Sequence, residues 1–470
     1  MSRALTHSVK LGRDRSSSPI FDKFVIVPIL ACAYVEIILP LLITTDAGTL
    51  VGGMWTAAQQ KIMMAPRLEN KIFWPAMASI SVIWAVRNWS RLTLPPHIVC
   101  LFAYLAFAGA SIAWSFNPEV SFIRFVQQAM IITSIVLPAL LAARTADMMR
   151  GVFLCFAFAL ILNVFFVLDQ NPMIPEIGRK AYAGYFTFKG ELGHSAAFAL
   201  LLSLHEILYP GWRRRFGVIV IAVAIYLVVL SDSNGSLGLA LLAPLLAGIT
   251  LFIGKKLRVS PAIVLVPIPV FYTVLSYIVG NLINRISWHV YGNYDLSGRV
   301  FIWDFANLEI ARKPLLGWGY QSFWLSGPDA PSITDAPAWI KDMPNAHNGY
   351  LDTMVDMGYV GFALLVIFLV ATLHAIGRVA DREPSRAWHL LTLALFVILT
   401  NFVETGWMHN YDILWVMFVV VAAEIGRYCQ HFPSVVSEPM RRGLVIAGRR
   451  PGLVRPEGIG KLGQFQKRRM

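Results

Sequence analysis

The strongest constraint on this chain is a series of apolar runs, each long enough to cross a hydrocarbon core of about 30 Å. Helices are the spanning structure that such runs favour, because every backbone polar group in lipid must be bonded internally. With 57% hydrophobic and 14% charged residues, the 470-residue chain has more apolar surface than a soluble domain could bury. The runs cover 24–45, 72–86, 97–115, 120–142, 150–169, 194–209, 216–231, 236–253, 260–280, 350–376, 387–402 and 410–426. The sequence therefore predicts an all-α, polytopic membrane protein with about 12 transmembrane helices.

The basic residues predict the orientation, because Lys and Arg are retained on the cytoplasmic side during insertion. If both termini are cytoplasmic, most of the 40 Lys and Arg fall in inner segments, such as WRRR at 212–215 and KKLR at 255–258. The short outer loops NPE at 117–119 and DSNGS at 232–236 contain none. This topology, together with anionic lipid headgroups, explains the net charge of +13 better than nucleic-acid binding does.

The two ends of the chain are both basic in this topology. Residues 1–23 lead into the first span without a cleavable-signal pattern, so that span is expected to act as a signal anchor. Residues 427–470 form a basic cytoplasmic tail, and residues 46–60 are apolar enough to hide a further half-helix. The chain has no Walker loop and no Asp-rich nucleotide-metal motif, and its four cysteines lack metal-ligand spacing, so no cofactor and no metal are predicted.

Two long outer segments interrupt the spans, and loops of such length are usually functional or disordered. The first covers 170–193, within the block of spans 1–9 at 24–280, and the second covers 281–348, before spans 10–12 at 349–426. The second is rich in aromatic side chains, namely Trp288, Tyr291, Tyr294, Trp303, Trp318, Tyr320, Trp324 and Trp339. They fit an interfacial belt or loop core, and they also fit platforms for sugar rings; the two interpretations are compatible.

A helix is predicted inside the second outer segment, from Gly298 to Arg312. Phe301, Phe305, Leu308 and Arg312 recur at helical spacing, and Pro314 ends the pattern. Arg299 then lies in the first helical turn at the membrane mouth, either as an interfacial arginine or as a functional one.

Three stretches in a fixed order carry a family resemblance: SGRVFIW at 297–303, KPLLGWGYQSF at 313–323 and AHNGYLDTMVDMGYVG at 346–361. Set in a large outer loop late in the chain, they resemble the O-antigen ligase and polysaccharide polymerase superfamily, and within it the bacterial exopolysaccharide polymerases. The upstream GYFTFKGELGHSAAFALLL at 184–202 is similar to the H-K-N-x-L-G stretch of that group. Phe188 and Gly190 stand where the group has His and Asn. The resemblance covers about residues 180–410.

This resemblance implies a GT-C-like membrane glycosyltransferase of the bacterial inner membrane. Its donor would be an undecaprenyl-diphosphate-linked oligosaccharide, its acceptor a glycan hydroxyl at the periplasmic face, and its product an exopolysaccharide built with inversion at the anomeric carbon. Membrane lipids and a chain-length regulator or export complex are the further partners expected, and nucleic acid is not. An O-antigen ligase, which joins the glycan to lipid A core, differs only in its acceptor.

The proposed chemistry points to cations near the outer membrane border. A lipid diphosphate gains negative charge as it leaves, and guanidinium or ammonium groups can stabilise that charge. Arg299 matches the motif arginine of the family and is the first catalytic candidate. Arg179, Lys180 and Lys189 are the other candidate phosphate-binding residues on the outer side.

His347 is the second catalytic candidate. An imidazole near neutral pKa can accept the proton of the acceptor hydroxyl, or it can hydrogen-bond the diphosphate, and the sequence does not separate these roles. Asn348 could hold the sugar or fix the imidazole tautomer. Asp352 and Asp356 share one helix face and are candidate substrate-binding carboxylates, unless they lie in the headgroup layer or pair with a cation such as Arg124.

Three further ionisable residues, Glu404, His409 and His194, are weaker candidates, and His194 could simply anchor the start of a span. A transporter or lipid-linked-sugar flippase is a competing function. It should show paired half-repeats and broken helices with buried charge, which the sequence does not indicate. A non-catalytic scaffold of an export machine would need no motif at all.

Overall fold

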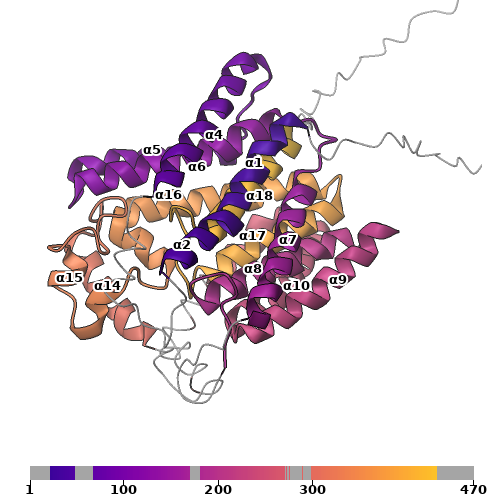
Figure 1. The fold of residues 1–470 in the computed structure, drawn as a ribbon. Helices are drawn as coiled ribbons and strands as arrows, with labels where there is room; N and C mark the ends of the chain where they lie inside the picture. The colour runs from indigo at the N-terminus through magenta and orange to yellow at the C-terminus, as the bar shows by residue number, and fades with distance from the viewer. Residues whose placement is uncertain are drawn as a thin grey trace, which may run out of the picture. The chain divides into compact units, whose positions relative to one another are not determined.

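The computed structural model describes residues 22–47, 67–169, 180–269 and 298–430, together with 271, 275 and 288. Within those residues the secondary structure is helical, and no β-strand is present (Figure 1). Several expectations fall elsewhere in the chain. The N-terminal segment before residue 22, most of the half-helix at 46–60, Arg179, most of 270–297 and the tail beyond 430 lie outside the described residues.

The apolar runs form helices wherever the structure describes them. The first half contains α1 (Lys23–Ala33), the π-helical η1 (Tyr34–Ile38), α2 (Leu39–Ala47), α4 (Leu68–Arg87), α5 (Pro96–Ala110), α6 (Pro118–Leu141) and α7 (Met148–Asp169). The rest of the described chain contains α8 (Lys189–Glu206), α9 (Trp212–Leu230), α10 (Asn234–Leu257), α11 (Pro261–Leu265), α14 (Arg299–Arg312), α15 (Pro331–Thr334), α16 (Gly349–Ala380), α17 (Pro384–Thr400) and α18 (Ile413–Gln430).

Seven helical segments in the described part of the chain are long and apolar enough to cross a membrane. They are Lys23–Asp46, Pro96–Trp114, Pro118–Leu141, Met148–Asp169, Asn234–Leu257, Gly349–Ala380 and Ile413–Gln430. The multi-pass, all-α class is confirmed, whereas the number twelve is not. α17 is apolar but shorter, α8 and α9 carry charged residues near their ends, and α11 shows only the start of the expected span at 260–280.

The last helix, α18, is the most enclosed of the spans. Every residue from Leu414 to Tyr428 is buried, and the helix packs against α6, α16, α17 and α5. An apolar surface on all sides is what a helix surrounded by other helices requires. α18 therefore forms the centre on which the outer elements are assembled.

A loop segment interrupts α16. Gly358 has φ 64° and ψ −168°, which breaks the helix after Met357. The N–H groups of Tyr359 and Val360 donate to the carbonyls of Pro314 and Leu315, at 2.8 and 3.2 Å. The carbonyls of Val355 and Asp356 accept from Trp318 and Gly319, at 2.9 and 2.7 Å.

Segment 314–319 therefore replaces two i to i−4 bonds of the helix with four bonds of its own. Glycine is required where the chains meet, since a Cβ on Gly317 would lie 2.5 Å from the Asp356 carbonyl carbon. The sequence indicated no broken helix, and this prediction is wrong for α16, which is interrupted at Gly358. The freed backbone groups are bound by the loop.

The predicted helix at 298–312 is confirmed as α14, but its buried face is not the predicted one. Phe301 and Leu308 are 57% and 66% exposed. The buried residues are Ile302, Phe305, Ala306, Glu309 and Ile310. They pack against Phe323, Trp324 and Val355 in a small core separate from the main one. The outer loop thus selects a face offset from the stripe that begins at Phe301, and α14 and α15 lie together in this part of the molecule (Figure 1).

Candidate functional site

A carboxylate joins the two residues predicted to be catalytic. Arg299 Nη2 donates to Glu404 Oε1 at 2.6 Å, and His347 Nδ1 lies 3.1 Å from Glu404 Oε2. The three side chains are 27%, 33% and 32% exposed, so the cluster remains open on one side. Residues far apart in the chain, on α14, before α16 and after α17, thereby form one site.

Local backbone geometry positions the Arg299 and His347 side chains. Gly298 adopts the left-handed region, φ 85°, directly before α14 and so turns the chain to put Arg299 in the first helical turn. His347 is itself left-handed, φ 47°, which is uncommon for a residue with a side chain. Its backbone N–H donates to Asn345 Oδ1 at 3.0 Å. A strained conformation at this position is typical of functional residues.

Asn348 and Asp352 hold this corner together. Asn348 is the N-cap of α16, and its Oδ1 accepts from the N–H groups of Tyr350 and Leu351 at 3.1 and 3.2 Å. The buried Asp352 carboxylate accepts from Trp324 Nε1 at 2.7 Å, from the Ala346 N–H at 3.0 Å and from the Thr405 hydroxyl. Asp352 thus links the neighbour of His347 to the neighbour of Glu404, and its oxygens are bonded within the protein.

The charge state of Glu404 fixes the chemistry of its neighbours. Burial alone would raise the pKa of Glu404, but the hydrogen bond from His347 and the charge of Arg299 outweigh it and lower the pKa to about 2. The carboxylate is therefore ionised at neutral pH and can only accept hydrogen bonds. His347 Nδ1 must then carry its proton, which leaves Nε2 as the basic nitrogen of the neutral ring. His194, on α8, also interacts electrostatically with Glu404 and Arg299.

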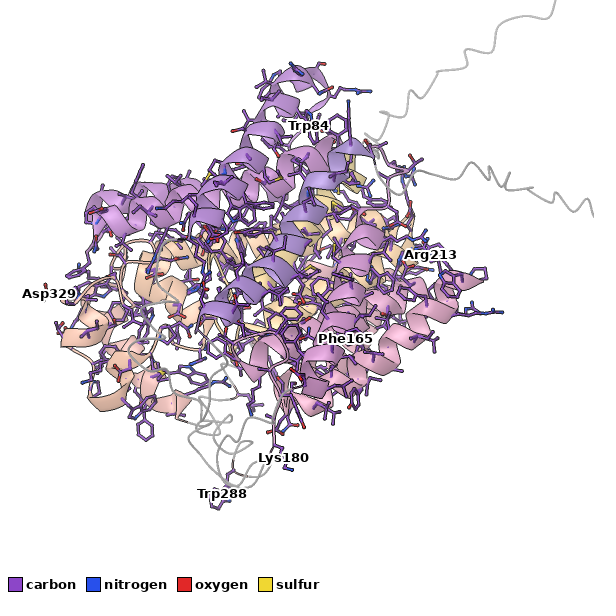
Figure 2. All side chains as sticks on the ribbon, viewed as in Figure 1. Trp84, Phe165, Lys180, Arg213, Trp288 and Asp329 are labelled. Carbon is purple, nitrogen blue, oxygen red and sulfur yellow. The ribbon has the colours of Figure 1, made fainter. Side chains whose placement is uncertain are left out.

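The predicted lysines lie elsewhere. Lys189 begins α8 and pairs with Asp232, with Nζ 3.4 Å from Oδ2. Lys180 is exposed at the edge of the molecule, at the end opposite Trp84 (Figure 2). No contact of either lysine with the Arg299, His347 and Glu404 side chains is present among the described residues.

Asp356 remains a candidate substrate-binding carboxylate. It is 6% exposed, and its Oδ1 has no hydrogen-bond partner in the described residues. Arg124 interacts with it electrostatically while donating to the Gln321 carbonyl. Arg124 and Asp356 form no ion pair among the described residues, so the alternative that they pair is met only by an interaction between charges at longer distance. Burial and, to a lesser extent, the charge of Arg124 lower the pKa of His409 to about 4.

Sequence reasoning gave Glu404 too little weight and treated His194 as a span anchor. A carboxylate 105 positions from Arg299 carries no local pattern that would pair them. The available signal was the position of Glu404 in a short polar stretch between two apolar runs, on the same predicted side as His347. Thr405, whose hydroxyl links Asn348 to Asp352, gave no signal at all.

A comparison with known proteins matches part of the chain to a protein family. Residues 193–366 match the protein family described as O-Antigen ligase, a region that contains Arg299 and His347. The chain is thus similar to membrane proteins of the O-antigen ligase and polymerase type.

Two relatives give the match more detail. The chain is 24% identical over 328 residues to "Exopolysaccharide production protein ExoQ" of Rhizobium meliloti, covering 67% of this chain and 73% of that protein. It is 23% identical over 255 residues to "Putative polysaccharide ligase" of Rickettsia conorii, covering 50% of this chain and 56% of that protein. Polysaccharide assembly is thus the common theme of the names.

Proposed function

We propose that this chain polymerises undecaprenyl-diphosphate-linked oligosaccharide repeat units into exopolysaccharide at the periplasmic face of the bacterial inner membrane. The observation that carries the proposal is the sharing of one ionised carboxylate, Glu404, by Arg299 and His347. Both termini are cytoplasmic in this proposal, so the site faces the periplasm. The likeness to an exopolysaccharide production protein supports polymerisation.

The geometry supports a direct transfer. The acceptor hydroxyl oxygen attacks the anomeric carbon while its proton passes to Nε2 of the neutral His347 ring, whose Nδ1 faces Glu404. The bond from that carbon to the diphosphate oxygen breaks, and the lipid diphosphate leaves with the electron pair. Arg299 uses only one N–H on Glu404 in the described structure, so its other N–H groups can stabilise the developing charge. Asp356 and the lysines are the remaining candidates for substrate binding, with Asn348 and Asp352 placing the histidine.

Ligation is the second candidate function, because the matched family is described as O-Antigen ligase. The same residues would act, with lipid A core as the acceptor. A flippase gains little support from the broken α16, since the loop segment 314–319 occupies the freed backbone groups. A chain-length regulator or export complex stays a proposed partner.

The test is the glycan profile of cells that lack this chain and are complemented with variants. We expect Arg299→Ala and His347→Ala to insert normally and to abolish long polymer. Arg299→Lys should rescue poorly, because an ammonium group cannot bind a diphosphate through two parallel bonds. Arg312→Ala is the matched control, since Arg312 ends the same helix, is 55% exposed and pairs with Glu309 and Asp335.

The outcomes separate the functions. Loss of high-molecular-weight polysaccharide with intact lipopolysaccharide supports polymerisation. Polymer that is made but no longer joined to lipid A core supports ligation. Full complementation by both alanine variants would overturn the proposed site.

A further inference from the structure

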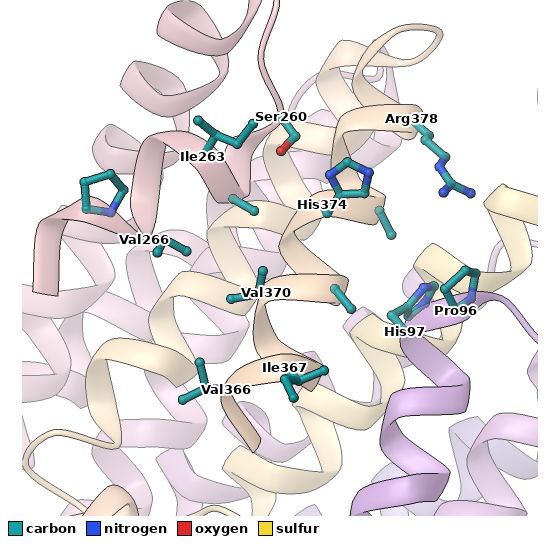
Figure 3. A pocket seen from close by; sticks show the side chains of 14 residues that line it. Pro96, His97, Ser260, Ile263, Val266, Val366, Ile367, Val370, His374 and Arg378 are labelled. Carbon is teal, nitrogen blue, oxygen red and sulfur yellow. The ribbon is translucent and has the colours of Figure 1, made fainter. Parts of the chain in front are cut away.

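A cavity of about 710 Å³ lies far from the candidate site. It runs between the start of α5, the region of α11 and the second half of α16 (Figure 3). Its walls are mostly aliphatic, and none of its fourteen lining residues is acidic. Because Arg378 is near the C-terminal end of α16 and His347 precedes its N-terminal end, the two sites belong to opposite membrane faces.

The length of the groove matches one leaflet. The lining residues of α16 extend from Val366 to Arg378, which is about 18 Å at 1.5 Å per residue. Half of a hydrocarbon core is about 15 Å. Val366, Ile367 and Ile263 are partly exposed and form an apolar channel along this length.

Polar and cationic groups gather at one end of the groove. Figure 3 shows Ser260, His374 and Arg378 together there. The Ser260 hydroxyl is buried and has no hydrogen-bond partner in the described residues. Arg378 forms no ion pair with the described residues. The basic KKLR segment at 255–258 lies just before Ser260 in the chain.

The close packing of α11 on α16 builds this end. A Cβ on Gly377 would lie 3.1 Å from Pro261 and 3.7 Å from Ser260, so the small residue lets the two elements approach. Ser260 is thereby held one helical turn or less from His374 and Arg378. An arginine with no ion pair among the described residues, above an aliphatic channel, is complementary to an anionic head above an acyl chain.

We propose that this groove binds an anionic phospholipid of the leaflet opposite the candidate site. The phosphate lies at Arg378, His374 and Ser260, and one acyl chain follows the aliphatic wall towards Val366. The site is independent of the glycosyl-transfer proposal, because none of its residues belongs to the Arg299 cluster.

The test is native mass spectrometry of the full-length chain in detergent, titrated with phosphatidylglycerol or with phosphatidylcholine of identical acyl chains. We expect phosphatidylglycerol to be retained preferentially. Arg378→Gln should weaken its binding about fivefold, which corresponds to about 1 kcal/mol for one cation at an anionic surface. Arg87→Gln is the matched control, since Arg87 is an exposed cation in the last turn of α4.

A second variant tests the channel. Val370→Trp should fill the groove and weaken binding of both lipids while the protein stays monodisperse, because the cavity has room for the ring. A hundredfold excess of inorganic phosphate should not displace the lipid. Equal retention of the two lipids, equal effects of Arg378→Gln and Arg87→Gln, or displacement by phosphate would each overturn the proposal.

Discussion

Glu404 shows how one side chain determines the properties of its neighbours. Its two oxygens contact Arg299 and His347 at 2.6 and 3.1 Å, so the carboxylate orients a cation and a base at once. The ionised acid holds a proton on His347 Nδ1, so Nε2 is the nitrogen that can accept a proton when the ring is neutral. In the proposed transfer reaction, Glu404 is thus a positioning residue that acts through the imidazole of His347.

The first residue-scale prediction concerns Glu404→Gln. The pKa of Glu404 is lowered from 4.5 to about 2, so the stability gained from its charge is complete above pH 4.5 and is lost as pH falls towards 2. Glu404→Gln should therefore lower the thermal unfolding temperature at pH 7. The difference in unfolding temperature between the variant and wild type should shrink as the pH falls below 4.5. Thermal unfolding of the detergent-solubilised protein across about pH 3 to 8, which covers the upper part of that window and the plateau above it, measures this.

Asp335→Asn provides the control for that experiment. Asp335 pairs with the exposed Arg312 at the loop surface, where an ion pair contributes little. A difference in unfolding temperature between Glu404→Gln and wild type that stays constant with pH would contradict the charge state assigned to Glu404.

At the scale of elements, the close contact between segment 314–319 and α16 explains why the motifs at 313–323 and 346–361 are rich in glycine. Gly317 and Gly358 both adopt left-handed backbone, at φ 68° and 64°. A Cβ on Gly358 would lie 2.3 Å from the Leu315 carbonyl carbon. KPLLGWG and DMGYVG are therefore the two halves of one contact.

Substitution of these glycines tests the contact. Gly317→Ala and Gly358→Ala should each lower stability by about 1–3 kcal/mol or more, because left-handed strain adds to a backbone clash. Gly238→Ala in α10 is the matched control, since nothing lies within 4 Å of its Cβ and alanine favours a helix. The test compares the unfolding temperatures of the three purified variants. Equal unfolding temperatures would contradict the close contact between segment 314–319 and α16.

The sequence predicted elements better than contacts. The apolar runs located α5, α6, α7 and α16 within a few residues, because burial in lipid imposes a long uninterrupted pattern. It missed the buried face of α14, which is set by Phe323 and Trp324 from later in the chain. It likewise could not pair Glu404 with Arg299, since long-range contacts have no periodicity.

At the scale of the whole molecule, the distribution of basic residues and the helices together imply opposite faces for the two sites described above. Seven spans are supported by length and apolar character within the described residues. Of the other expected spans, the one at 260–280 lies partly outside the described residues, and the rest are short or flanked by charge. Orientation therefore rests on the charge pattern and can be measured directly.

Labelling tests this orientation. A cysteine at the exposed Asp329 (Figure 2) should react with a membrane-impermeant maleimide from the periplasm. A cysteine at the exposed Lys256 should react only after the membrane is opened. The chain without an introduced cysteine gives the background from its four native thiols. Labelling of both positions from the same side would reject the topology.

The union of segment 314–319 with α16 also has a mechanical consequence. Four backbone hydrogen bonds tie the outer loop to a transmembrane helix, so lifting the loop would break all four and uncover helix backbone. The part of the loop that carries Arg299 is thereby fastened to the helix that follows His347. In the proposed reaction, a lipid-borne donor would then have to reach Arg299 and His347 laterally from the bilayer, while the outer loop stays in place above them.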